Sequence, residues 1–180
     1  MLPCTVVAIT CSLARADIVF LVDSSRSVCR SDSTCSNWQS VLDFVNSIVN
    51  QLNIGTDNTR VGFVRYSSTS ATSNEFYLNN NYDQSRVTSA VSTVQYDTGR
   101  SYVGDLTNAF SVARTQQFVS NRGDRIGAPN IIIVLTNGGI SATSNAVSLF
   151  VYSFSIFTCV IRVFHNHRSV LVIHKNQSTQ

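Results

Sequence analysis

Histidine is almost absent from this 180-residue chain, and its three copies, His165, His167 and His174, all lie near the C-terminus. A Ser–His or Cys–His nucleophilic pair therefore cannot form in the residues before them. The chain also lacks a glycine-rich phosphate loop of the P-loop type and any internal repeat. These absences argue against an enzyme, and we expect no catalytic residues.

Charge is also scarce and is unevenly placed. Charged residues make up 13% of the chain and hydrophobic residues 43%, which is typical of one globular domain. No Asp or Glu follows Val147, but three of the 13 Lys and Arg residues do: Arg162, Arg168 and Lys175. The other Lys and Arg residues equal the 10 Asp and Glu in number, so the main body is neutral. The net charge of +3 predicts no nucleic-acid partner.

The most informative stretch is an apolar run that ends in oxygen-bearing side chains. Ile18 to Val22 is apolar without alternation, which predicts a strand buried on both faces. Asp23, Ser25 and Ser27 follow at every second position. In an open α/β sheet, ligands bind beyond the carboxyl ends of the strands, and these oxygens suit Mg²⁺ or Ca²⁺. The alternative is that Ser25 or Ser27 only caps a following helix.

Apolar spacing predicts the other elements of the main body. Spacings of three and four indicate helices over 38–52, 83–94 and 105–118. Apolar or alternating runs indicate strands over 60–66, 75–78 and 130–136. Strands that alternate with helices are typical of an α/β fold.

Three stretches together resemble a von Willebrand factor type A domain of the extracellular matrix type, as in matrilins and collagen-associated A domains. They are Asp17 to Ser27, Arg60 to Ser67 and Pro129 to Gly138. The resemblance covers residues 17–147 and implies a doubly wound, mostly parallel, Rossmann-like α/β sheet with helices on both faces. Because it ends there, we expect the C-terminal part of the fold to be incomplete.

The resemblance also implies a metal-ion-dependent adhesion site formed by Asp23, Ser25, Ser27, Ser101 and Asn137. Ser101 stands where the family usually has threonine, and it keeps the hydroxyl oxygen. Asn137 stands where the family usually has aspartate, and an amide oxygen contributes no negative charge. We therefore expect binding of Mg²⁺, with Mn²⁺ or Ca²⁺ as alternatives, to be weak or absent.

Two cysteines bracket a short polar segment directly after this motif. Cys29 and Cys35 predict a local disulfide if the protein is secreted. Such a bridge would staple the metal-motif loop to the next helix. The alternative is a pair of free thiols in a reducing compartment.

The two ends of the chain have more than one interpretation. Residues 1–16 have a short apolar middle and end in Ala14-Arg15-Ala16, which predicts a signal peptide; the alternative is a fragment left by a gene-model boundary. Residues 148–180 form a divergent tail that could be a poor transmembrane segment, a divergent helix and strand completing the fold, or translated non-coding sequence. We expect no membrane span. The tail contains a glycosylation sequon, Asn176 to Ser178.

The leading functional hypothesis is a secreted module of the extracellular matrix that binds proteins. The resemblance implies that its metal site recognises an acidic side chain of a matrix or cell-surface partner, collagen-like or other. The alternative is a truncated structural module without metal, or a mis-spliced product without independent function. The triplet Arg122 to Asp124 could in addition be an integrin-binding sequence, or it could arise by chance in a polar loop.

Overall fold

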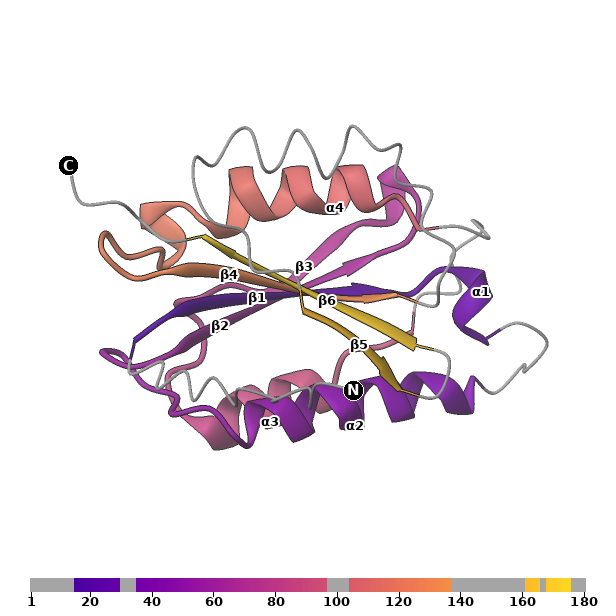
Figure 1. Ribbon diagram of the computed structural model, residues 1–180, viewed down its shortest axis with the longest axis horizontal. Helices are drawn as coiled ribbons and strands as arrows, with labels where there is room; N and C mark the ends of the chain where they lie inside the picture. Colours follow the sequence, from indigo (N-terminus) through magenta and orange to yellow (C-terminus); the bar gives the residue numbers. More distant parts are fainter. Residues whose placement is uncertain (1–14, 30–34, 97–103, 137–160, 166–167, 176–180) are drawn as a thin grey trace, which may run out of the picture.

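The structure is a computed structural model, and it describes residues 15–29, 35–96 and 104–136, together with the backbone of two strands at 161–165 and 168–175. In the described residues a single sheet lies between two layers of helices (Figure 1).

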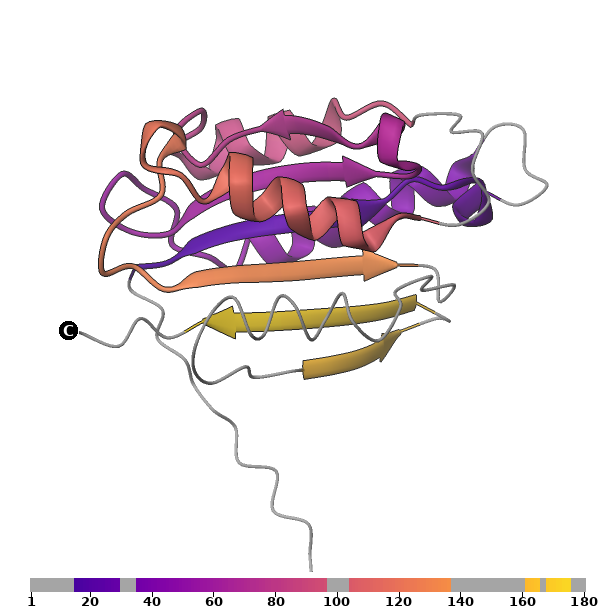
Figure 2. The same cartoon turned by 90° about the horizontal axis from the view of Figure 1, so that it is seen from above.

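Six strands form this sheet in the order β3-β2-β1-β4-β6-β5 (Figure 2). Their bounds are β1 (Asp17–Asp23), β2 (Arg60–Tyr66), β3 (Ser73–Phe76), β4 (Asn130–Thr136), β5 (Ile161–His165) and β6 (Arg168–Lys175). The three central strands β2, β1 and β4 run parallel, whereas β3, β6 and β5 each pair antiparallel with a neighbour. The sheet is therefore mixed, with a parallel centre.

Helices cover both faces of the sheet, as Figure 1 shows. Their bounds are α1 (Arg26–Cys29), α2 (Ser36–Val49), α3 (Gln84–Ser92) and α4 (Leu106–Val112). A π-helical turn (Ala113–Gln117) continues α4, and short 3-10 turns lie at Thr69–Ala71 and Ser120–Arg122. The doubly wound α/β fold expected from the sequence is confirmed.

The sheet separates two apolar cores. All seven residues of β1 and all seven of β4 are buried, as the unbroken apolar runs predicted. Phe20 packs with α2 and α3 on one face, and Leu21 packs with Phe110 of α4 on the other. Each fully buried large apolar side chain contributes about 1.5–3 kcal/mol, so both faces stabilise the central strands.

Two element boundaries differ from those predicted. The helix expected over 105–118 is α-helical only to Val112, because the π-helical turn brings Gln117 inward. Gln117 is fully buried, and its Nε2 donates to Asn74 Oδ1 at 2.8 Å and to the Phe76 carbonyl at 3.0 Å. The strand expected over 75–78 lies at 73–76, since its pairing with β2 shifts register near Phe63.

A hairpin of β5 and β6 extends the sheet beyond β4. β6 pairs antiparallel with the whole of β4, with Asn130 opposite Lys175 and Thr136 opposite Ser169. The outer edge of β4 is therefore covered. Residues 137–160, between β4 and β5, lie outside the described residues, so the expectation of an incomplete C-terminal part stays a prediction.

Candidate functional site

Three polar side chains form a row where the parallel strands end, a region that we call the carboxyl edge. Asp23 ends β1, pairs with Tyr66 of β2, and is flanked on its other side by Thr136 of β4. Side chains alternate along a strand, so all three share the face of the sheet that packs against α4. They are only 3%, 1% and 6% exposed, respectively.

Both oxygens of the Asp23 carboxylate accept hydrogen bonds. The Ser25 backbone N–H donates to Asp23 Oδ1 at 2.8 Å, and Thr136 Oγ1 donates to Asp23 Oδ2 at 3.4 Å. These contacts fix the orientation of the carboxylate at the end of β1.

The two motif serines lie beside each other. Ser25 Oγ and Ser27 Oγ are hydrogen-bonded at 2.9 Å; Ser25 is fully buried and Ser27 is half-buried. The structure therefore brings Asp23, Ser25 and Ser27 together where β1 ends and α1 begins.

These donors have the chemistry of a site for a hard cation. One carboxylate and two hydroxyls offer only oxygen ligands. Such ligands suit Mg²⁺, Mn²⁺ or Ca²⁺ rather than a metal that prefers thiolate or imidazole ligands. Within the described ranges, no group of three or more His, Cys, Asp or Glu side chains could hold a metal ion. Because its donors are all oxygen, the set at Asp23 fits the cation type that the sequence predicts.

Ser101 and Asn137, the other two predicted ligands, lie outside the described residues. Their neighbours in the chain are described and lie at Asp23. Thr136, directly before Asn137, donates to the Asp23 carboxylate. A Cβ atom on Gly104, three residues after Ser101 in the chain, would lie 3.0 Å from Asp23 Oδ1.

Tyr66 is a residue at this edge that the sequence analysis did not single out. Burial raises the pKa of its phenol well above 10, the negative charge of Asp23 raises this pKa further, and a hydrogen bond with Thr136 acts in the opposite direction. The phenol is therefore neutral at physiological pH. The strand register could have identified Tyr66, because it and Asp23 both end parallel strands.

Further contacts hold the loop that follows Asp23. The Ser24 N–H and Oγ both donate to the Tyr66 carbonyl, at 2.8 and 3.2 Å, and the Tyr96 hydroxyl donates to the Ser25 carbonyl at 3.3 Å. Cys29 and Cys35 form a disulfide with their Cα atoms 5.0 Å apart. The loop is thus fixed to β2, to the segment after α3 and to the start of α2.

The Arg122–Asp124 triplet lies in the described residues, and its interpretation as an integrin-binding sequence stays a prediction. Gly123 is buried with φ +101°, and a Cβ there would lie 2.7 Å from the backbone nitrogen of Asn79. Arg122 stacks over the Tyr77 ring at 4.1 Å, and Asp124 is half-buried. The triplet therefore forms a tight turn that packs on its own domain.

Among the described helices, none has the length and apolar content that a membrane span requires.

Comparisons with known proteins agree with this architecture. The family model described as "von Willebrand factor type A domain" matches residues 17–173, so the match continues past Val147. The chain is 37% identical to mouse matrilin-2 over 134 residues, which cover 72% of this chain and 13% of matrilin-2. It is 30% identical to the human collagen alpha-5(VI) chain over 128 residues, or 71% of this chain and 4% of that one. It is also 30% identical to chicken integrin alpha-1 over 122 residues, or 68% of this chain and 39% of that one.

Solved structures share the fold. Proximal thread matrix protein 1 from the mussel byssus, in a structure titled "with zinc occupied MIDAS motif", superposes with a TM-score of 0.66 at 19% identity. The superposition covers 76% of this chain and 35% of that one. At this identity the likeness supports the fold alone.

The chain spans only a small part of the collagen and matrilin relatives, so it corresponds to one domain of such proteins. The family match covers most of the chain, and the sheet has helices on both faces with a carboxylate and hydroxyls at its carboxyl edge. The chain therefore belongs to the von Willebrand factor type A domain family.

Proposed function

We propose that this domain is an extracellular module of matrix or adhesion type that binds a protein partner through a divalent cation at the carboxyl edge. The observation that carries the proposal is the convergence of Asp23, Ser25 and Ser27 where β1 ends and α1 begins. Relatives among matrilins, collagen chains and an integrin support the same class of function. The domain acts by binding and has no catalytic role.

The residues that would hold the cation are Asp23, Ser25 and Ser27, joined by Ser101 and Asn137 from the neighbouring loops. When bound, the cation supplies a positive centre that can take a carboxylate oxygen of an Asp or Glu on the partner. The chain's own part is to fix Asp23, through the Ser25 N–H and the Thr136 hydroxyl, and to keep the serine hydroxyls side by side.

The affinity for Mg²⁺ is weak in this proposal because Asn137 replaces a carboxylate. One negative charge in place of two lowers the attraction to a divalent ion, and each tenfold loss in affinity corresponds to about 1.4 kcal/mol. Mn²⁺ is a useful probe, because carboxylate, carbonyl and water oxygens suit Mn²⁺ as they suit Mg²⁺. A structure titled as manganese-loaded Plasmodium vivax TRAP protein, with a TM-score of 0.50, shares the fold.

The test is binding to immobilised collagen preparations in Mg²⁺ or Mn²⁺ and in EDTA, with Asp23→Asn as the matched variant. Binding that EDTA and Asp23→Asn both abolish supports the proposal. Binding that neither treatment changes would favour the second candidate, a structural matrix module that attaches through other surfaces without metal. The specific observation that favours this second candidate is Asn137, whose amide replaces a metal-binding carboxylate.

A further inference from the structure

We propose that Tyr96 is a positioning residue, which holds the backbone of Ser25 and so keeps the Ser25 hydroxyl beside the other candidate ligands. Tyr96 is half-buried and follows α3 in the chain. The cation at Ser25 rests on the proposed function. The hold on the Ser25 backbone does not need a cation, so it can be tested separately.

Tyr96 reaches Ser25 from a distant part of the chain. Its hydroxyl donates to the Ser25 carbonyl at 3.3 Å, although the two residues are 71 positions apart. The same carbonyl accepts from the Val28 N–H at 3.0 Å, and the Ser25 N–H donates to Asp23 Oδ1 at 2.8 Å. The backbone of Ser25 is therefore held at both its N–H and its carbonyl. This backbone carries Ser25 Oγ, which lies 2.9 Å from Ser27 Oγ.

Trp38 of α2 supports the ring of Tyr96. The two ring centroids are 5.6 Å apart and the ring planes are tilted by 55°, an arrangement that aromatic pairs favour. Trp38 is only 6% exposed, and its Nε1–H donates to the Val94 carbonyl at 2.9 Å. The Tyr96 ring therefore packs against a side chain that is itself fixed, and this packing directs the hydroxyl to Ser25.

Helix α1 depends on such contacts because it has only four residues. A helix this short is not stable by itself in water, since few backbone hydrogen bonds offset the conformational entropy that it loses. Asn37 Nδ2 donates to the Val28 carbonyl at 3.2 Å, and the Cys29–Cys35 disulfide joins the end of α1 to the start of α2. These two contacts act within α1, whereas Tyr96 acts on the residue directly before it.

Tyr96→Phe removes the hydroxyl and keeps the ring on Trp38. In the wild type, opening the turn that starts at Ser25 separates its carbonyl from both the Val28 N–H and the Tyr96 hydroxyl. In the variant only the first bond opposes this opening. A distance of 3.3 Å is long for an O–H···O bond, so the effect should be modest. We expect the Val28 amide proton to exchange with solvent about threefold faster, as measured by NMR on the full chain without a cation.

Tyr82→Phe is the matched control. It removes the same hydroxyl near the opposite end of β2, where Arg60 lies over the Tyr82 ring at 5.3 Å. We expect a wild-type rate of Val28 exchange in this variant, and equal unfolding free energies of the two variants in urea. Unchanged Val28 exchange in Tyr96→Phe, or an equal increase in Tyr82→Phe, would overturn the proposal. So would a loss of global stability in Tyr96→Phe large enough to account for the faster exchange.

Calorimetric titration with Mn²⁺ separates the positioning role from the proposed function. We expect Tyr96→Phe to bind Mn²⁺ about tenfold more weakly than the wild type, the lower end of the effect typical of groups that orient a metal ligand. Tyr82→Phe should bind as the wild type does. Equal binding by Tyr96→Phe and the wild type would overturn the positioning role. A wild type that binds no Mn²⁺ would refute the proposed function, and the Val28 exchange rates would still decide whether Tyr96 holds Ser25.

Discussion

The two ends of β1 each bury an aspartate on the same face of the sheet, but they hold it differently. Asp17 accepts from Nη2 and Nε of the Arg125 guanidinium at 2.6 and 2.9 Å, and from the Arg125 N–H at 2.8 Å. The contacts described for Asp23 come from neutral donors, the Ser25 N–H and the Thr136 hydroxyl. A buried carboxylate matched by a fixed cation stabilises the fold. A carboxylate oxygen is also a ligand that a hard cation accepts, which is the role proposed for Asp23.

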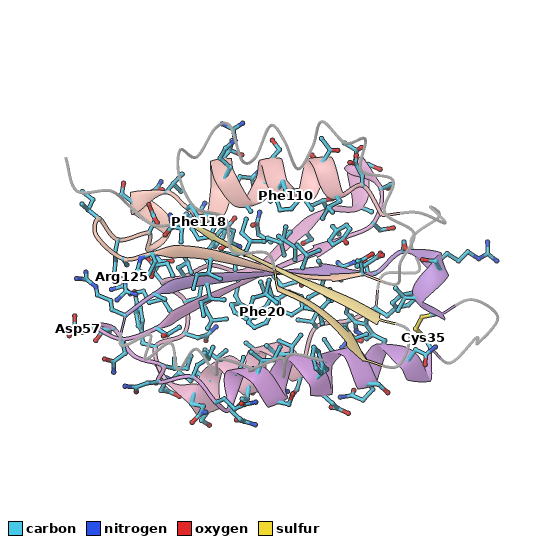
Figure 3. All side chains as sticks on the ribbon, in the orientation of Figure 1. Phe20, Cys35, Asp57, Phe110, Phe118 and Arg125 are labelled. Carbon is cyan, nitrogen blue, oxygen red and sulfur yellow. A yellow bond between two sulfur atoms is a disulfide. The ribbon has the colours of Figure 1, made fainter. Side chains whose placement is uncertain are left out.

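The amino edge, where β1, β2 and β4 begin, is thus built for stability. The guanidinium of Arg125 also donates to the carbonyls of Ala16, Thr56 and Asn58. In Figure 3, Arg125 and Asp57 lie at this end of the molecule, and Cys35 lies at the opposite end, near the candidate site. Substitutions at the amino edge and at the carboxyl edge test this contrast.

The largest effect is expected for Arg125→Ala at the amino edge. The change leaves Asp17 buried without its cation, which typically costs about 3–5 kcal/mol of unfolding free energy. Urea denaturation measures this loss. Arg86→Ala is the control, because its pair with Asp83 is exposed and should contribute less than about 1 kcal/mol. Equal losses in the two variants would remove the contrast.

At the carboxyl edge, Gly104→Ala should destabilise the domain by about 1–3 kcal/mol. The new Cβ has no room between the Tyr66 ring and Asp23, and overpacking of this kind forces backbone shifts. Gly55→Ala is the matched control, since its nearest contact is the movable end of Asn58 at 3.1 Å. Thermal unfolding of both variants measures the difference, and an unaffected Gly104→Ala would contradict the close packing at the site.

Removing the Cys29–Cys35 disulfide measures how much the bridge contributes to the unfolding free energy of the domain. Opening the short Cys29–Cys35 loop, by a double change to serine, should cost roughly 2 kcal/mol in the chain-entropy description. Denaturation with and without reductant measures the cost in the wild type. Mass spectrometry that finds two alkylatable thiols in secreted material would show that the bridge is absent.

A smaller change in stability is expected for Asp23→Asn. The amide keeps the shape and the hydrogen-bond acceptor toward Ser25, so unfolding free energy should change by less than about 1 kcal/mol. The comparison with Arg125→Ala is direct, because both changes affect a buried aspartate of the same strand. A loss as large as that of Arg125→Ala would mean that Asp23 is held for stability rather than for a ligand.

Local patterns in the sequence predicted much of the fold. The unbroken apolar run from Ile18 to Val22 and the similar run in β4 identified strands buried on both faces. Side chains on both faces of such a strand are shielded from water, so the sequence does not alternate with polar residues. Apolar spacing located α2 and α3 within a few residues. The inward turn of Gln117 was not predictable, since it depends on partners in β3 that lie about 40 residues away.

Of the candidate site, the sequence indicated those described residues that are neighbours in the chain. Asp23, Ser25 and Ser27 lie within five residues of one another, and their spacing carries the signal. Tyr66 and Thr136 reach Asp23 through strand register, which local patterns do not specify. The Asp17–Arg125 pair joins residues 108 positions apart for the same reason.

Titration calorimetry with Mn²⁺ on the wild type, Asp23→Asn and Asn137→Asp tests the central claim most directly. The account predicts weak binding by the wild type, at least about tenfold tighter binding by Asn137→Asp, which is about 1.4 kcal/mol, and no binding by Asp23→Asn. Equal Mn²⁺ binding by Asp23→Asn and the wild type, or no gain from Asn137→Asp, would contradict a cation site at the carboxyl edge.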